Sequence, residues 1–389
     1  MRVVELYCGI GGVAAALRMS RPDAEVVGAF DISAPAVAVY NHNFPGHPAK
    51  VRLIETLPAE RLKRLEADLF WLSPPCQPHT RRGHRRDLDD PRSRTFLAAL
   101  ALIAECRPQW VALENVAGFE ESEARDRLLD TLADAGYAAP QELLLCPSEL
   151  GWPNRRPRYY LLAGIRTGDW APASPARRAG VRVGAVACLD PIVVNPEIPR
   201  TGDWAPASPA RRAGETIGAL ARFQRPRGSA RSPWPKCVGS PRLEEDTLPP
   251  QLSPRHDVPA RPGPSPQSEN LQLADLLDRV PDPGLALTPS VAERYATALD
   301  RVDPADPAGI AACFTSAYGR SPVRSGSYLL RPDGGLRHFS PGEVLRLLGF
   351  PADFAFPPGI SRQLAWRLAG NSLSLPAVQA LLASLPASR

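Results

Sequence analysis

Short apolar runs alternate with longer amphipathic segments along the first 165 residues. The runs that we expect to form strands are Val3–Tyr7, Glu25–Phe30, Asp68–Leu72, Trp110–Leu113 and Tyr159–Ala163. The segments that we expect to form helices are Val13–Met19, Ala34–Asn41, Phe96–Glu105 and Ala124–Ala135. Because strands and helices alternate, the pattern predicts an α/β fold: a doubly wound, parallel sheet with helices on both faces.

This pattern stops after residue 165 and returns near residue 291. Pro, Arg, Ser and Gly dominate residues 166–270, a composition that buries little apolar surface, so we expect loops or disorder there. The 15 residues Arg166–Gly180 recur unchanged at Arg200–Gly214, which we interpret as a local duplication because two copies are too few for a solenoid. The chain therefore divides into residues 1–165, 166–290, 291–335 and 336–389.

Three further helices are expected in the last of these regions. Ser340-Pro341 is typical of a capped helix start, and Gly349 of a helix end, which predicts a helix over Gly342–Leu348. Gln363–Leu368 and Pro376–Leu385 are predicted to form the other two.

The composition excludes several classes of protein. In 389 residues, 44% are hydrophobic and 22% are charged, as in ordinary globular proteins. No apolar run approaches the ~20 residues of a membrane helix, and the N-terminus lacks the features of a signal peptide. The seven cysteines are scattered without any Cys-x-x-Cys pair, so we expect free thiols, no metal site and a cytoplasmic location. Nothing in the sequence sets an oligomeric state, and a monomer is the default.

The charge is uneven along the chain. Residues 151–270 carry a net charge of +8, and the rest of the chain carries −3. A basic segment on a weakly acidic body fits a polyanionic partner such as nucleic acid, but it equally fits a solvated loop.

A glycine-rich turn joins the first predicted strand to the first predicted helix. Its sequence is Glu5-Leu-Tyr-Cys-Gly-Ile-Gly-Gly12, and such a turn lets the backbone approach a nucleotide closely. Asp31 ends the next strand, where a carboxylate accepts hydrogen bonds from ribose hydroxyls. Both NAD and S-adenosylmethionine enzymes use this arrangement, but the glycine spacing differs from G-x-G-x-x-G and disfavours NAD.

Three more motifs lie at strand ends. Ser73-Pro-Pro-Cys-Gln-Pro78 places the Cys76 thiol at the carboxyl edge of the sheet, where a thiolate can attack an electron-poor carbon. Glu114-Asn-Val116 offers a carboxyl group that can donate a proton if it is buried. Asn154-Arg-Arg-Pro-Arg158 offers guanidinium groups for a base, a phosphate or Glu114. Each motif alone also fits a plain structural role.

Taken in this order, and completed by Gly370-Asn-Ser372, the four motifs resemble the cytosine-C5 methyltransferase superfamily over residues 1–165 and about 310–385. The finer resemblance is to the DNA methyltransferase 2 homologues, which methylate cytosine 38 in the anticodon loop of aspartate tRNA. The Glu-Leu-Tyr opening and Cys313-Phe-Thr315 carry that resemblance, whereas His79 stands where this family usually has Phe.

The resemblance implies a Rossmann-like, S-adenosyl-L-methionine-dependent methyltransferase domain with a smaller, Pro/Arg-rich target recognition region. It implies that Cys76 is the nucleophile, Glu114 the acid, and Arg156 and Arg158 the positioning guanidinium groups. The cofactor residues that it implies are Ile10, Gly11, Gly12, Asp31, Ile54, Glu55, Ser73, Asn371 and Ser372. We interpret Cys313 as a structural thiol.

The resemblance also assigns the four regions. Residues 1–165 would be the catalytic, cofactor-binding domain, and 166–290 an insert together with part of the target recognition region. Residues 291–335 would carry the rest of that region with the Cys-Phe-Thr motif, and 336–389 would return to the catalytic domain.

Three alternatives remain at this stage. The first is a DNA cytosine-C5 methyltransferase, for example of a restriction–modification system, although Cys313-Phe-Thr315 favours tRNA as the nucleic-acid partner. The second is a former enzyme that only binds nucleic acid, against which the intact Cys76 and Glu114 argue. The third is a nicotinamide oxidoreductase, which the glycine spacing disfavours.

Overall fold

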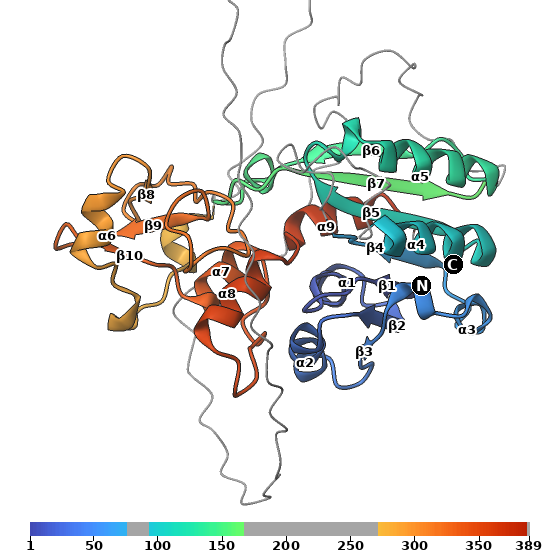
Figure 1. Ribbon diagram of the computed structural model, residues 1–389, viewed down its shortest axis with the longest axis horizontal. Coiled ribbons are helices and arrows are strands. Elements are labelled where there is room, and N and C mark those ends of the chain that lie inside the picture. Colours follow the sequence, from blue (N-terminus) through green and yellow to red (C-terminus); the bar gives the residue numbers. More distant parts are fainter. Residues whose placement is uncertain (76–92, 167–270, 387–389) are drawn as a thin grey trace, which may run out of the picture. The chain divides into compact units, whose positions relative to one another are not determined.

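The structure, a computed structural model, describes residues 1–75, 93–166 and 271–386 (Figure 1). Cys76 and most of the duplicated sequence fall outside the described residues, as does the Pro/Arg-rich segment 167–270. Within the described ranges no helix is both long and apolar enough to cross a membrane.

A seven-stranded sheet with the strand order β3-β2-β1-β4-β5-β7-β6 organises the first 165 residues. Its strands are β1 (Arg2–Leu6), β2 (Glu25–Asp31), β3 (Lys50–Val51), β4 (Leu69–Leu72), β5 (Trp110–Val116), β6 (Gln141–Leu145) and β7 (Arg158–Gly164). Strands β1 to β5 run parallel, and β7 runs antiparallel to both of its neighbours. The expectation of a wholly parallel sheet is therefore wrong at this edge. The connection from β6 to β7 holds only the short 3-10 helix η3 (Pro147–Leu150), and parallel neighbours usually need an α-helix as crossover.

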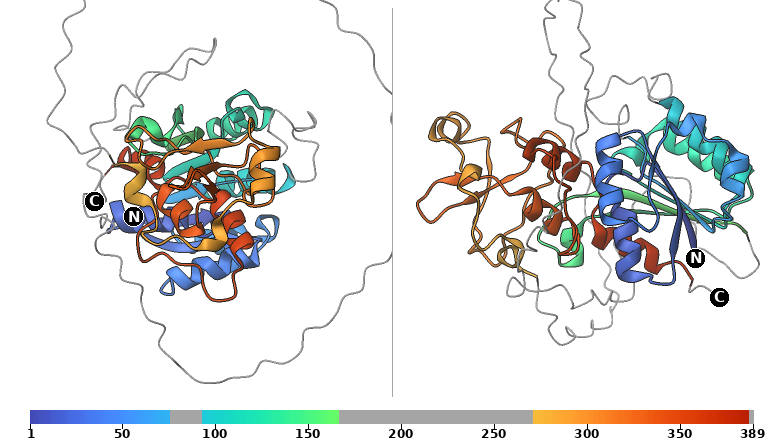
Figure 2. Two further views of the ribbon diagram at one scale, coloured as in Figure 1. Left: turned by 90° about the vertical axis from the view of Figure 1, so that its left-hand side faces the viewer. Right: turned by 90° about the horizontal axis from the view of Figure 1, so that it is seen from below.

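Helices cover both faces of this sheet, as the α/β pattern predicts (Figures 1 and 2). They are α1 (Gly12–Ser20), α2 (Ala34–Asn43), α3 (Ala59–Lys63), α4 (Ser93–Cys106), α5 (Glu123–Asp134) and α9 (Leu375–Ala383). Consecutive strand residues point to opposite faces, so Val3 belongs to the core under α1, α2 and α9, and Val4 to the core under α3, α4 and α5. Helix α9 packs against α1, so the end of the chain returns to the first domain.

A smaller sheet and several short helices form the rest of the described chain. The sheet has the order β10-β9-β8, with β8 (Asp300–Val302), β9 (Ser327–Leu330) and β10 (Leu336–Arg337). The helices are η4 (Leu273–Leu276), η5 (Pro283–Leu285), α6 (Pro289–Arg294), α7 (Pro341–Leu347) and α8 (Arg362–Gly370). Leu273, Leu276 and Leu285 are buried, so residues 271–290 contribute to the core here.

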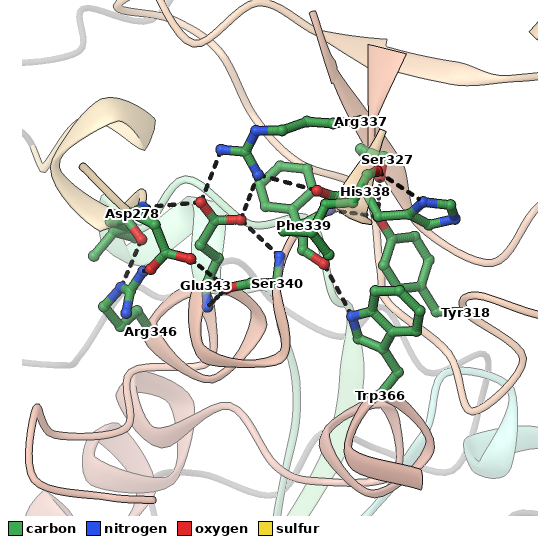
Figure 3. Close-up of polar contacts among 12 residues, drawn as sticks. Asp278, Tyr318, Ser327, Arg337, His338, Phe339, Ser340, Glu343, Arg346 and Trp366 are labelled. Atoms are coloured by element: carbon green, nitrogen blue, oxygen red, sulfur yellow. Dashed lines mark hydrogen bonds and ion pairs between the residues drawn. The ribbon is translucent and has the colours of Figure 1, made fainter. Parts of the chain in front are cut away.

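Helix α7 starts at the predicted cap. The Ser340 hydroxyl accepts from the Glu343 N–H and the Glu343 carboxylate accepts from the Ser340 N–H, which is a capping box. Gly349, with φ of +84°, ends the helix as expected. The fully buried Glu343 also binds both terminal nitrogens of Arg337 at 2.7 and 2.8 Å, and Asp278 binds Arg346 (Figure 3). These hydrogen bonds and ion pairs link β10 and the segment after η4 to α7.

Candidate active site

A cavity of about 420 Å³ opens at the carboxyl ends of β1, β2, β4 and β5. It is lined by residues of the glycine turn, the ends of these strands, the arginine motif and the segment after α8. The lining residues include Tyr7, Ile10, Gly12, Asp31, Ile32, Ser73, Glu114, Arg156, Arg158, Ser316, Asn371 and Ser372. Both its volume and its position at this sheet edge are typical of a small-molecule site in an open α/β fold.

The glycine turn takes a left-handed backbone at three positions, with φ of +63° at Tyr7, +54° at Gly9 and +96° at Gly11. A Cβ atom on Gly11 would lie 2.6 Å from the ring of Phe44, the residue that follows α2, so this position requires glycine. The Tyr7 hydroxyl donates to the Thr95 carbonyl at 2.7 Å and fixes the turn to α4. The turn thereby places the first residues of α1 at the cavity.

Asp31 holds the second strand end in contact with this turn. Its carboxylate accepts the N–H of Gly9 at 2.9 Å and the N–H of Ser33 at 2.7 Å. Burial raises the pKa of this carboxyl group, and the two backbone hydrogen bonds oppose the rise. The next residue, Ile32, lines the cavity with 66% of its surface exposed. A carboxylate beside an exposed apolar side chain matches the ribose and the base of a nucleoside.

Glu114 and Arg158 meet because of the antiparallel β7. The start of β7 lies beside the end of β5, with Val116 opposite Arg158, so the arginine motif reaches the same edge as Glu114. The Arg158 Nε lies 3.4 Å from a Glu114 carboxylate oxygen. Burial raises the pKa of Glu114, while Arg158 and Arg156 lower it, and burial prevails. A carboxyl group whose pKa is raised in this way keeps its proton to higher pH and can act as an acid.

Arg156 binds protein carbonyl groups from distant parts of the chain. Only 3% of its surface is exposed, and it donates to the Phe314 carbonyl at 2.9 Å, to Gly370 at 3.2 Å and to Ser372 at 2.5 Å. A Cβ atom on Gly370 would lie 2.4 Å from the Thr315 carbonyl, so these two segments touch closely. Arg156 therefore joins residues 313–316 to the segment 370–372 at the rim of the cavity.

The structure brings together most of the predicted site residues that it describes. Ile10, Gly12, Asp31, Ser73, Glu114, Arg156, Arg158, Asn371 and Ser372 all line the cavity. Gly11 packs on α2 instead, Ile54 is buried in η1 (Ile54–Thr56) within the core that α4 covers, and Glu55 is exposed. Cys76 lies outside the described residues, although Pro74 and Pro75 before it line the cavity.

Sequence reasoning missed several lining residues, among them Tyr7, Ile32 and Ser316. Ile32 follows Asp31 directly, so its position after a strand-terminal carboxylate was a usable signal. Ser316 comes from a loop far along the chain, and no local pattern marks it.

Comparisons with known proteins agree with this geometry. Residues 1–177 match the family described as C-5 cytosine-specific DNA methylase. The chain is 32% identical over 417 aligned residues to the tRNA (cytosine(38)-C(5))-methyltransferase of Mus musculus, covering 99% of this chain and 93% of that protein. It is 30% identical to the type II methyltransferase M.AgeI of Thalassovita gelatinovora, over 48% of this chain and 44% of that one.

Among solved structures, the chain is similar to the Dnmt2 methyltransferase of S. pombe, with a TM-score of 0.68 and 26% identity. That similarity covers 98% of this chain and 97% of the other. It extends from the strand ends around the cavity to the smaller sheet and α9. The Rossmann-like methyltransferase fold is thus confirmed, and the chain belongs to the C-5 cytosine methyltransferase family.

Proposed function

We propose that this enzyme methylates C5 of cytosine in tRNA, in the anticodon loop of aspartate tRNA. The observation that carries the proposal is the extent of similarity. The relative named as a tRNA (cytosine(38)-C(5))-methyltransferase matches 99% of the chain, whereas the type II methyltransferase matches 48%. The larger match includes the Cys313-Phe-Thr315 segment, which contacts the cavity through Arg156. Because the relative named for tRNA shares nearly the whole chain and the type II methyltransferase about half of it, tRNA is the better-supported substrate.

The cavity suits S-adenosyl-L-methionine as the methyl donor. Asp31 offers carboxylate oxygens to ribose hydroxyls, and the exposed Ile32 offers an apolar surface to the adenine ring. Asn371 and Ser372 also line the cavity and provide further polar groups. When bound, this cofactor supplies a methyl group on a positively charged sulfur.

The residues of the chain make cytosine C5 reactive. C5 is a poor nucleophile in the aromatic ring, and addition of the Cys76 thiolate to C6 turns the ring into an enamine. Glu114 donates a proton to N3 and so prevents negative charge from building up there. Once C5 carries the methyl group, loss of the C5 proton and elimination of the Cys76 thiolate restore the aromatic ring, and N3 returns its proton to Glu114. General acid catalysis of this kind contributes ~10²–10⁴-fold.

The target base has to leave its stack to reach this cavity. In duplex DNA, extrusion of a base costs a few kcal/mol, and an unstacked loop lowers that cost. Recognition of single-stranded RNA loops commonly uses such splayed bases. We further propose a cytoplasmic location, where Cys8, Cys106, Cys146 and Cys313 remain free thiols, as they are in the structure. A monomer stays the default oligomeric state.

Methyl transfer from radiolabelled S-adenosylmethionine tests the proposal. A tRNA pool and duplex DNA are offered side by side to the wild type, to Cys76→Ala and to Cys106→Ala, whose thiol lies on α4 at the Ala59 carbonyl. We expect label in tRNA from the wild type and from Cys106→Ala, and none from Cys76→Ala. Label in DNA alone would refute the tRNA assignment, and full activity of Cys76→Ala would refute the covalent mechanism.

A further inference from the structure

Two arginines of the site, the buried Arg156 and the half-buried Arg158, contact one sulfur atom. Arg156 Nη1 donates to Cys313 Sγ at 3.3 Å, and Arg158 Nη2 donates to the same sulfur at 3.6 Å. Cys313 is half-buried and lies behind the two guanidinium groups, outside the cavity lining. It therefore touches the residues that act on the substrate and not the substrate itself.

Without a charge on the Cys313 sulfur, positive charge exceeds negative charge among the groups around it. The groups that face it and its two arginines are Glu114, 3.4 Å from Arg158, and the Tyr160 phenol, whose pKa burial raises so far that it stays neutral. Two guanidinium charges thus face one carboxyl group. When Glu114 holds the proton that it donates in the reaction, neither of these two groups carries a negative charge, and unbalanced charge in a buried site is costly.

The sulfur is suited to supply the missing charge. Burial opposes ionisation of the Cys313 thiol, but Arg156 and Arg158 outweigh it and hold its pKa below the usual value. Cationic neighbours stabilise thiolates in the same way in other proteins. By contrast, burial and Glu105 raise the pKa of Cys106 to about 11.

We propose that Cys313 is a positioning residue for the methyl-transfer reaction: its thiolate is the standing counter-charge of Arg156 and Arg158, and it keeps Arg158 at Glu114 in both protonation states of the acid. This inference rests on the proposed function, since it assigns Glu114 as the proton donor. It replaces the expectation that Cys313 is a structural thiol.

Substitutions at Cys313 separate charge from packing. Serine preserves the size of the side chain but stays neutral, whereas aspartate is larger but supplies the charge. If the Cys313 thiolate is the counter-charge, methyl transfer should be slow in Cys313→Ser and Cys313→Ala and faster than both in Cys313→Asp. A packing role requires the reverse order, with serine close to wild type and aspartate worst.

The pH profile of single-turnover methyl transfer is the informative readout. Loss of the negative sulfur leaves Glu114 facing two uncompensated cations, which lowers its pKa, so the protonated form is lost at lower pH. We expect the basic limb of the profile to move about one unit toward acid in Cys313→Ala and Cys313→Ser. We also expect a rate loss of roughly tenfold or more, as for a charge-assisted hydrogen bond, and Cys313→Asp to restore the limb. An unmoved limb in Cys313→Ala, or wild-type rates in Cys313→Ser, would overturn the proposal.

A thiol titration gives a result that does not depend on methyl transfer. The full chain is alkylated with iodoacetamide over a pH series, and the extent of reaction at Cys313 and Cys106 is measured by mass spectrometry of their peptides. We expect Cys313 to react with a midpoint below that of Cys106, and this midpoint to rise in Arg158→Gln. A midpoint at or above that of Cys106, or no reaction at Cys313, would overturn the inference even if the enzyme proves fully active on tRNA. If the thiol midpoints are as expected but the protein methylates no substrate, only the proposed function is refuted.

Discussion

Replacement of Glu114 by glutamine removes the proposed proton donor while changing the side chain least. The carboxyl group has a pKa raised by burial, and its contact with Arg158 is long at 3.4 Å. A glutamine keeps an oxygen that can accept from Arg158, but it has no proton to give to N3. The substitution should therefore affect the chemical step far more than the fold.

The expected loss follows from general acid catalysis. Such catalysis contributes ~10²–10⁴-fold, which corresponds to about 3–5.5 kcal/mol of activation free energy. The cost in stability should stay below the ~3–5 kcal/mol typical of a broken buried ion pair, because burial favours the neutral form of Glu114 and its contact with Arg158 is long. The methyl-transfer rate should fall by at least a hundredfold with little change in the midpoint of urea unfolding.

Glu142→Gln is the matched control. Glu142 is another partly buried acid on the same sheet, and it binds Arg125 through two contacts of 2.7 Å. It does not line the cavity. This variant should lose more stability than Glu114→Gln and keep its activity. Single-turnover rates and urea unfolding of both variants test the reasoning, and a Glu114→Gln rate within tenfold of wild type would refute it.

Three other substitutions test separate parts of the structure. Burial raises the pKa of Glu5 to about 8, so the folded state keeps a proton that the unfolded state releases above about pH 4.5. The free energy of unfolding should therefore fall between pH 5 and 8 by the order of 3–5 kcal/mol. Glu5→Gln should flatten this pH dependence in urea titrations, and an equal slope in both proteins would contradict the prediction. Arg337→Met leaves the buried Glu343 carboxylate without its cation and should cost ~3–5 kcal/mol. A second substitution, Glu343→Leu, should restore part of this loss, although it also removes the capping box of α7. Thermal unfolding in which the double variant is the less stable would argue against this. Asp31→Asn should weaken S-adenosylmethionine binding roughly 10- to 100-fold in calorimetry, and a Kd within threefold of wild type would exclude the ribose role.

Local sequence pattern was sufficient for much of the fold. The helices α1 and α7 and the strands β1, β2 and β4 follow from apolar periodicity, glycine turns and the Ser340 cap, which act over a few residues. The direction of β7 did not follow, because it depends on the connection from β6 and not on the residues of the strand. Strand β3, with two residues, was too short to leave a periodic signal.

The candidate site was predictable where it depends on strand ends. Asp31 and Glu114 meet at one cavity because the carboxyl ends of parallel strands share an edge. The contacts of Arg156 with Phe314, Gly370 and Ser372 span more than 150 residues of sequence, and no spacing rule brings such segments together. The position of Cys313 between two arginines was hidden for the same reason.

The proposed function requires this chain to methylate one cytosine of an anticodon loop at C5. The most direct measurement offers the enzyme two aspartate tRNA transcripts that differ only at position 38, with cytosine in one and uridine in the other, and quantifies 5-methylcytidine by mass spectrometry. We predict 5-methylcytidine in the first transcript and none in the second. Equal 5-methylcytidine in both transcripts, or none in either while duplex DNA is methylated, would contradict the account.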